Sequence, residues 1–382
     1  MPANKDRILN EFIKLVSFDS ESYHERKIAD YLIDELGRIG IEAQEDRAYE
    51  ILSNEAVIEK NSYNAGNIFA RTPATGSGKP LLFSAHMDTV KPGNGKRAIV
   101  QEDGRITSDG TTVLGADDIG GIVAILEMLR VYKEDSIPHP ELEIIFPIAE
   151  EPYGQGSRVF DYTQIKARAA FVLDLSGSLG RAAIAAPTII SFTIQIRGKS
   201  AHAGFCPEDG IHAIAIASEA ISRLKNGWVS EDTTLNIGTI QGGTQRNSVP
   251  DYVEITGEIR SLEHDKALDQ EKHVKEIFDN VAKKYGGEAA FESTIQIKSY
   301  RTSKDSEAVK RFEAACLKIF SKEGELIETY GGSDHNHFAQ HEIEGIVVAS
   351  AMQDVHTTSE YTTIDDLYKV AELAIELGRS TV

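Results

Sequence analysis

Cysteine and tryptophan are scarce in this chain of 382 residues. Cys206 and Cys316 are the two cysteines, and the chain has one tryptophan. The cysteines lie far apart and outside any CxxC pair, so neither a disulfide framework nor a thiolate metal site is indicated. We therefore expect a protein of a reducing compartment.

Basic residues are also in short supply. The sequence has 40 lysines and arginines against 60 aspartates and glutamates, which gives a formal charge of −20. Such a charge repels phosphate backbones and anionic lipid, and this excludes nucleic acid as a partner. Hydrophobic residues at 41% and charged residues at 26% match an ordinary globular protein, so the acidity belongs to folded surfaces or to a site.

Long hydrophobic runs are absent. No window approaches the ~20 apolar residues that a membrane span requires. The stretch from Met1 to Phe18 mixes charged with apolar residues and has no small-residue cleavage site, so it is typical of an amphipathic helix rather than a signal peptide. We expect a cytoplasmic protein without a membrane anchor.

The length predicts two or three domains, and hydrophobic spacing indicates how they are arranged. Residues 8–39 have the spacing of two helices. Short apolar runs then alternate with helical patterns, and this alternation predicts an α/β domain with a largely parallel sheet. The expected elements are strands near 81–85, 144–149 and 169–173, and a helix near 117–131.

The pattern changes at about residue 188. The run TIISFTIQIR at 188–197 alternates as a strand does, and it begins a β-α-β-β-α-β order that is typical of a compact α+β domain. We expect its further elements at 210–224, 235–240, 252–260, 265–285 and 289–297. The α/β pattern then resumes, with helices near 308–320 and 363–378 and a buried strand at 346–351. The predicted domains are therefore 1–187 with 300–382, and an inserted 188–299.

Acidic and histidine residues follow several of the predicted strands. His86 and Asp88 follow LLFSA, Glu150 and Glu151 follow IIFPIA, Asp174 follows AAFVL, His356 comes shortly after IVVASA, and Asp117 opens a helix behind a glycine. Ligands of open α/β sheets bind beyond the carboxyl ends of the strands. Five segments therefore deliver polar groups to one edge of the sheet.

Each of these signals also has an ordinary structural interpretation. His86 and Asp88 point the same way from a strand end, which suits metal binding with an oriented imidazole but also a turn cap. Asp117 fits a helix cap. The adjacent carboxylates of Glu150 and Glu151 allow one to bind metal and the other to act on water, although surface pairs of this kind are common. The inference rests on the whole set.

Counted as ligands, the set holds two imidazoles and three carboxylates: His86, Asp117, Glu151, Asp174 and His356. Five ligands serve two three-ligand sites if one carboxylate bridges, and hydrolytic two-metal sites hold their ions ~3.5–4 Å apart. Mixed nitrogen and oxygen ligands favour zinc, with cobalt or manganese as alternatives.

At these residues the sequence resembles the M20 metallopeptidase family, most closely its peptidase T-like branch. The resemblance rests on HMD at 86–88, GADDIGG at 115–121, EE at 150–151, GKSAHAG at 198–204 and HTTSEYTTIDDL at 356–367. It implies a zinc-exopeptidase-like catalytic domain with one zinc on His86, Asp117 and Asp174, and another on Asp117, Glu151 and His356. It also implies that Asp88 orients His86 and that Glu150 is the general base.

The resemblance assigns further roles. The inserted domain would serve as a lid and dimerisation domain, and His202 would reach a partner subunit's site and hydrogen-bond the oxyanion. Asn247 and Arg260 would contact substrate, with Arg301 a weaker candidate, and Glu360 would support the site. Ile119 departs from the family, because many members have lysine there. His335 and His337 match no ligand position.

The sequence thus predicts a homodimeric dizinc exopeptidase acting on short peptides, most closely an aminotripeptidase. A dipeptidase or an N-acyl amino acid amidohydrolase would share every metal residue and remains an alternative. A catalytically silent metal-binding scaffold would need a broken ligand or base, and none is broken. No GxSxG sequence occurs, which argues against a serine hydrolase on this α/β sheet.

Overall fold

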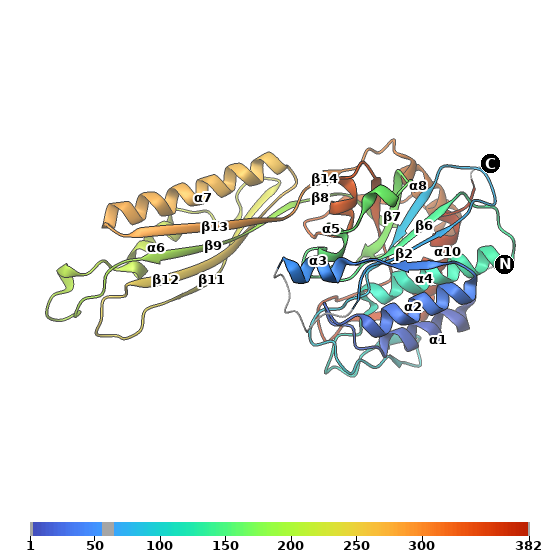
Figure 1. The fold of residues 1–382 in the computed structure, drawn as a ribbon, viewed down its shortest axis with the longest axis horizontal. Coiled ribbons are helices and arrows are strands. Elements are labelled where there is room, and N and C mark those ends of the chain that lie inside the picture. The colour runs from blue at the N-terminus through green and yellow to red at the C-terminus, as the bar shows by residue number, and fades with distance from the viewer. Residues whose placement is uncertain (1–2, 56–64, 381–382) are drawn as a thin grey trace. The chain divides into compact units, whose positions relative to one another are not determined.

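The computed structural model describes residues 3–55 and 65–380 of the chain. These residues form two compact units (Figure 1). The first unit comprises Met1–Ala185, Arg301–Thr329 and Ser333–Val382, and the second comprises Ala186–Tyr300 with Tyr330–Gly332. The sequence pattern gave no sign that 330–332 belongs with the second unit.

The first unit is built on a mixed sheet whose four central strands, β6, β3, β7 and β16, run parallel. This confirms the predicted α/β class with a largely parallel sheet. In spatial order the strands are β1 (Ala43–Glu45), β2 (Ile68–Thr72), β6 (Leu142–Phe146), β3 (Leu81–Ser84), β7 (Ala169–Leu175), β16 (Glu344–Ala349), β8 (Arg181–Ala186) and β14 (Tyr300–Arg301), and β15 (Glu325–Glu328) pairs with β8.

Helix α4 is the central helix of this unit. It spans Ala116–Glu134 and is buried from Ala116 to Tyr132, because most of its residues are apolar and its charged Glu127 and Arg130 pair with residues of α1. It packs against β3 and β7 and against three amphipathic helices. The helices of the unit are α1 (Lys5–Val16), α2 (Arg26–Ile39), α3 (Ala48–Asn54), α4, α5 (Gln155–Arg158), α8 (Glu307–Phe320), α9 (His335–Ala339) and α10 (Ile364–Leu377). A small sheet of β17 (Tyr361–Thr363), β5 (Arg105–Thr107) and β4 (Ile99–Val100) completes it.

The second unit is an antiparallel sheet with two helices. Its strand order is β10 (Gly227–Trp228), β11 (Thr233–Gly242), β12 (Tyr252–Ser261), β9 (Thr188–Arg197) and β13 (Glu288–Ile297), and its helices are α6 (Ala213–Ser222) and α7 (His264–Tyr285). Alternate residues of β9, such as Ile190 and Ile194, are buried in one core with Ile216 and Phe278 of the helices. The predicted β-α-β-β-α-β order is confirmed, and β10 is an additional strand.

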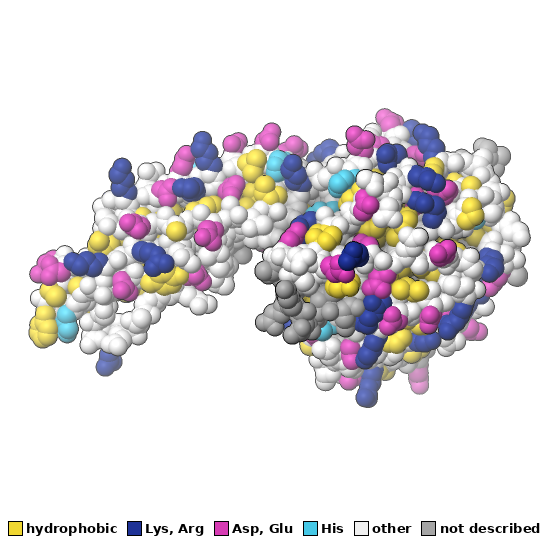
Figure 2. Space-filling view, viewed as in Figure 1, with side chains coloured by type: hydrophobic (Ala, Val, Ile, Leu, Met, Phe, Trp, Pro, Cys, Tyr) yellow, Lys and Arg dark blue, Asp and Glu magenta, His cyan; other side chains and the backbone are white. Residues whose placement is uncertain are grey.

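Charged side chains are distributed over the surface. On the face shown in Figure 2, acidic and basic side chains are interspersed on both units, so the surplus of acid is not gathered into one patch on that face. Within the described part of the chain, no helix combines the length and the apolar character needed to span a membrane.

Candidate active site

The carboxyl ends of the parallel strands bring the predicted ligands of the first unit together. His86 follows β3, Glu151 follows β6, Asp174 is the next-to-last residue of β7, and His356 follows β16. Asp117 joins them from the start of α4, where Asp117 and Asp118 have non-helical backbone angles and are linked by a cis peptide bond. These five side chains form two overlapping groups.

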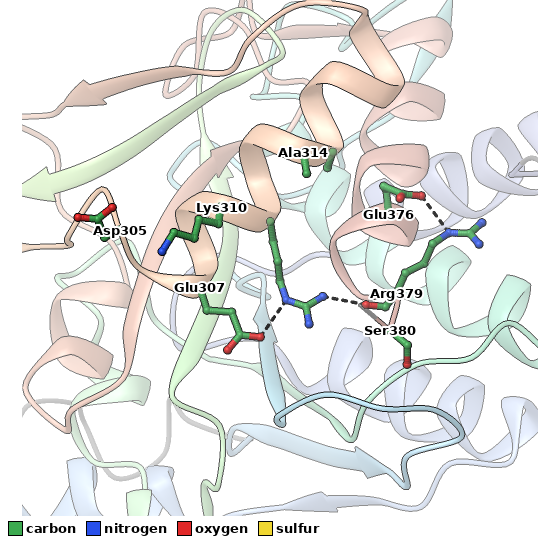
Figure 3. Close-up of a pocket in the computed structure, with 9 residues that line it drawn as sticks. Asp305, Glu307, Lys310, Ala314, Glu376, Arg379 and Ser380 are labelled. Atoms are coloured by element: carbon green, nitrogen blue, oxygen red, sulfur yellow. Dashed lines mark hydrogen bonds and ion pairs between the residues drawn. The ribbon is translucent and has the colours of Figure 1, made fainter. Parts of the chain in front are cut away.

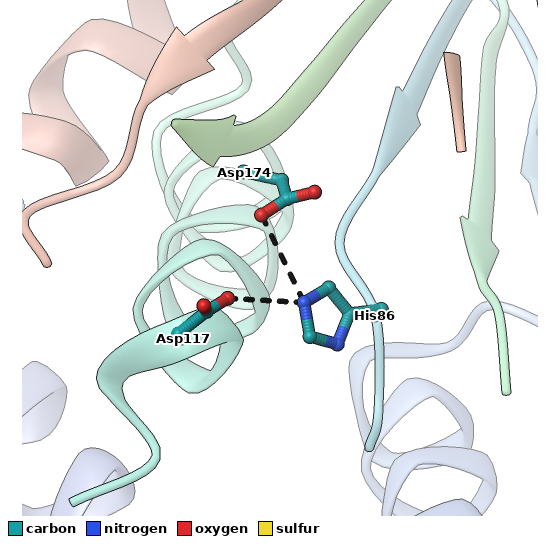
Figure 4. A group of neighbouring side chains, drawn as sticks. All are labelled: His86, Asp117 and Asp174. Carbon is teal, nitrogen blue, oxygen red and sulfur yellow. Dashed lines mark hydrogen bonds and ion pairs between the residues drawn. The ribbon is translucent and has the colours of Figure 1, made fainter. Parts of the chain in front are cut away.

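The first group joins His86, Asp117 and Asp174 (Figure 4). The Nε2 atom of His86 lies 3.1 Å from Oδ1 of Asp117 and 3.8 Å from Oδ1 of Asp174. All three residues lie at strand or helix ends around one point, and the imidazole is buried. The group therefore presents one nitrogen and two carboxylate oxygens to a shared centre.

The second group joins Asp117, Glu151 and His356. The Nε2 atom of His356 lies 3.2 Å from Oδ2 of Asp117 and 3.1 Å from Oε2 of Glu151. Asp117 thus turns one oxygen toward each histidine. This is the arrangement that a carboxylate bridging two ions requires.

The donor atoms suit metal ions. Within each group the candidate atoms all lie within 4.8 Å of one another. The Oε1 atom of Glu151 is buried without a hydrogen-bond partner among the described residues, and a buried polar atom of this kind calls for a ligand. Imidazole nitrogen with carboxylate oxygen is a donor set that zinc accepts.

The same carboxylates shift the pKa values of the site. Hydrogen bonds to Asp117 and Glu151 raise the pKa of His356 to about 11. Burial opposes the charge of His86, yet Asp117 and Asp88 outweigh it and hold the pKa of this histidine well above its ordinary value. Burial, and then the neighbouring Asp174, raises the pKa of Glu150 well above that of an exposed glutamate. The cluster therefore stabilises positive charge at its centre.

Asp88 does more than orient an imidazole. The Nδ1 atom of His86 lies 3.0 Å from the backbone oxygen of Asp88 and 3.3 Å from the carboxylate of Asp88. The carboxylate itself accepts the backbone N–H groups of Glu150 at 2.8 Å and Glu151 at 3.2 Å, and the hydroxyl of Ser22 at 2.7 Å. Asp88 therefore links two strand ends of the site.

Two further carboxylates hold the backbone around the ligands. Glu360, predicted to support the site, accepts the N–H of Gly115 at 2.7 Å and of Asp117 at 2.9 Å. Gly115 has a φ of 79°, which suits glycine at this turn. Asp118, which the sequence analysis did not single out, is fully buried and accepts the N–H of His86 at 3.2 Å. The only sequence signal for Asp118 is its position beside Asp117.

Three predicted residues lie in the second unit, and each has local partners there. Nδ1 of His202 accepts the N–H groups of Gly204 and Phe205, and its ring is exposed and stacked on Phe205. Asn247 is exposed in a loop, and its backbone oxygen accepts the N–H of Ala203 at 3.0 Å. The guanidinium of Arg260 contacts the carboxylate of Glu258 and the backbone oxygen of Tyr330.

The remaining candidates of the first unit lie outside both groups. Arg301 is exposed and pairs with Glu328. His335 is fully buried, and Nε2 of His337 lies 3.2 Å from the backbone oxygen of Tyr153. Neither histidine joins the metal groups found among the described residues.

A separate hollow of about 650 Å³ lies on the first unit, between α8 and the end of α10 (Figure 3). Four of its six charged residues pair with one another, Glu307 with Arg311 and Glu376 with Arg379. The acidic and basic side chains balance, so the hollow favours no ligand of one charge. The lining residues are Asp305, Glu307, Lys310, Arg311, Ala314, Ala315, Glu376, Arg379 and Ser380.

Known proteins resemble this chain in sequence and in fold. A family model described as a peptidase dimerisation domain matches residues 184–286, and one described as peptidase family M28 matches residues 67–204. Aminopeptidase PepT from Bacillus cereus is 37% identical with a TM-score of 0.91, covering 98% of both chains. A tripeptidase from Staphylococcus aureus is 32% identical with a TM-score of 0.94, covering 99% of this chain and 98% of its own. Protein YqjE from Bacillus subtilis is 37% identical over 98% of both chains.

The fold and the paired ligand groups define a metal-dependent peptidase, an exopeptidase among the hydrolases. The chain belongs to the M20 family, in its peptidase T-like branch.

Proposed function

We propose that this protein is a two-zinc aminopeptidase that removes the first residue of short peptides, with tripeptides as the preferred class. The observation that carries the proposal is the position of Asp117, which turns one carboxylate oxygen to each of two histidines beside the Glu150–Glu151 pair. The similarity to an aminopeptidase and a tripeptidase supports this substrate class.

Two metal ions would share Asp117. His86 and Asp174 would complete one site, and Glu151 and His356 the other. When bound, two divalent ions supply Lewis-acid activation of the peptide carbonyl and of water. The nitrogen and oxygen donors favour Zn²⁺, with Co²⁺ or Mn²⁺ as alternatives.

Glu150 acts as the general base. Its carboxylate takes a proton from the attacking water as the new carbon–oxygen bond forms. The same proton then passes to the nitrogen of the leaving amine as the carbon–nitrogen bond breaks. Burial and Asp174 raise the pKa of Glu150, and a carboxyl with a raised pKa transfers protons more effectively near neutral pH.

The second unit supplies groups that handle the substrate. His202, from a second copy of the chain, hydrogen-bonds the oxyanion, and Asn247 and Arg260 contact the peptide. Arg301, of the first unit, contacts the peptide as well. Arg260 already holds the carboxylate of Glu258, so a substrate carboxylate would compete with Glu258 for a planar guanidinium. The match to a peptidase dimerisation domain supports the homodimer.

A substrate screen tests the proposal. Protein reloaded with Zn²⁺ is assayed on a tripeptide, the same tripeptide with an acetylated amine, a dipeptide, a tetrapeptide and N-acetyl amino acids. We expect the free tripeptide to be cleaved fastest and EDTA to abolish the activity. Rapid deacylation of N-acetyl amino acids, with neglect of every peptide, would identify an amidohydrolase instead.

A further inference from the structure

The segment 148–151 carries Glu150 and Glu151 away from the end of β6 and into the site. Its backbone oxygens find backbone partners in the next turn. Those of Ile148, Ala149 and Glu150 accept N–H groups of Gly156, Gln155 and Gly154, respectively. The N–H groups of the segment itself need other acceptors, because buried backbone donors are almost always paired.

Side chains from three distant parts of the chain supply those acceptors. Oδ1 of Asn67 accepts the N–H of Ile148 at 3.1 Å, and Oε1 of Glu25 accepts that of Ala149 at 3.0 Å. The two carboxylate oxygens of Asp88 accept the N–H groups of Glu150 and Glu151. Four consecutive donors are thus held by side chains, and Glu25 holds the one directly before the proposed base.

We propose that Glu25 is a positioning residue, which fixes the backbone at Ala149 and thereby aims Glu150 and Glu151 into the site. The proposal rests on the roles given to these two glutamates above. Ala149 has a φ of 47°, in the left-handed region that residues other than glycine rarely adopt. Ala149 is fully buried, so in the folded protein its N–H depends on Oε1 of Glu25 as its acceptor.

The side chain of Glu25 bonds to these backbone groups and not to the helix that follows it. Glu25 precedes α2, yet its side chain makes no capping hydrogen bond to that helix. The side chain is fully buried, and Oε1 also accepts the N–H of Tyr23 at 2.9 Å, where φ is again left-handed at 70°. Oε1 of Glu25 therefore links the backbone at Tyr23 to the backbone at Ala149.

Burial favours the uncharged form of this carboxyl, and its hydrogen bonds to Tyr23 and Ala149 are those of an acceptor. Burial raises the pKa of Glu25 to about 8, and Asp88 contributes to that shift. A neutral side chain of the same length with an acceptor oxygen should therefore replace it. Glutamine has that shape, whereas aspartate keeps the acid but is one methylene shorter.

The experiment compares Glu25→Gln with Glu25→Asp and measures kcat, KM and the affinity for Zn²⁺ by titration of the metal-free protein. We expect the Asp variant to lose about 10- to 100-fold in kcat and in the affinity of the weaker zinc site, as is typical when a group behind a ligand is removed. We expect KM to stay within about twofold, and the Gln variant to keep wild-type values.

Glu143→Gln is the matched control. Glu143 is another fully buried glutamate, on β6 itself. Its carboxylate accepts the N–H groups of Lys166 and Ala167 and pairs with the guanidinium of Arg71, away from the site. This variant should keep kcat and zinc affinity. Wild-type kcat and zinc affinity in Glu25→Asp, or equal losses in both Glu25 variants, would overturn the proposal. A fully active Glu150→Gln variant would refute the role of Glu150 as general base. It would not refute the positioning role of Glu25, because the affinity for Zn²⁺ still reports on the position of Glu151.

Discussion

The carboxylate of Glu360 holds the backbone of Asp117, whose N–H donates to Oε1 at 2.9 Å. Glu360 lies in the same segment as His356, which contacts the carboxylate of Asp117 from the other side. A single stretch of chain after β16 therefore presents one ligand and fixes the position of another. Burial raises the pKa of Glu360 to about 7, well above that of an exposed glutamate.

Removal of His356 should leave one metal site intact. His356→Ala is expected to bind one Zn²⁺ per chain where the wild type binds two, since His86, Asp117 and Asp174 are unchanged. Zinc bound after dialysis, measured by mass spectrometry, checks this. His273→Ala, which alters an exposed histidine of α7, is the control and should bind two ions. Two tightly bound ions in His356→Ala would contradict the ligand assignment.

Replacement of the base should separate binding from turnover. Glu150→Gln is expected to keep both zinc ions and to lose about 10²- to 10⁴-fold in kcat, because the amide cannot accept the proton of water. Steady-state kinetics with parallel zinc analysis measures both quantities. Activity equal to wild type would remove Glu150 from the mechanism.

Lys96 makes the stability of the protein depend on pH. Burial lowers its pKa from 10.5 to about 8, although Asp19 and Glu360 oppose the shift. The folded protein therefore binds fewer protons than the unfolded chain between pH 8 and 10.5, and the free energy of unfolding should rise with pH in that window. Below pH 8 the buried ammonium carries its full penalty, about 3 kcal/mol.

Lys96→Met tests this. The variant removes the buried charge, so we expect a higher free energy of unfolding at pH 7 and a flatter rise between pH 8 and 10.5. The loss of hydrogen bonds to Ser20 and Thr89 reduces the gain. Urea unfolding at several pH values measures both effects. Lys27→Met, which replaces an exposed lysine, is the control. The same slope in Lys96→Met as in wild type would argue against Lys96 as its source.

A role for His202 across a dimer can be tested by mixing two inactive variants. His202→Ala and Glu150→Gln should each have low activity. After unfolding and refolding together, mixed dimers should regain activity, because one of their sites combines an intact Glu150 with an intact His202. The refolded mixture is compared with each variant refolded alone. No recovery, with dimers present by light scattering, would place His202 in its own subunit's site or outside the reaction.

The sequence was most informative where periodicity and strand ends coincide. The alternation in residues 188–197 predicted β9, and polar residues after apolar runs predicted His86, Glu151 and Asp174 at one edge of the sheet. Short strands such as β1 and β17 were missed, because three residues are too few to show a period.

The residues whose side chains hold the backbone around the ligands could not be predicted from the sequence. Glu25, Asn67 and Asp118 act through hydrogen bonds from a side chain to the backbone of a distant segment, and such bonds leave no pattern along the chain. The carboxylate of Asp88 was expected to orient His86, yet it also holds the N–H groups of Glu150 and Glu151. Only the folded backbone shows which donors need an acceptor.

The order of the ligands along the chain has a consequence for biosynthesis. His86, Asp117, Glu151 and Asp174 are all translated before the second unit, and His356 and Glu360 follow it. A nascent chain therefore holds neither the ligand that completes the second group nor the carboxylate that fixes Asp117 until translation has passed residue 360. A chain that stops before residue 356 should be unable to cleave peptides, so peptidase activity begins only after the second unit has been translated.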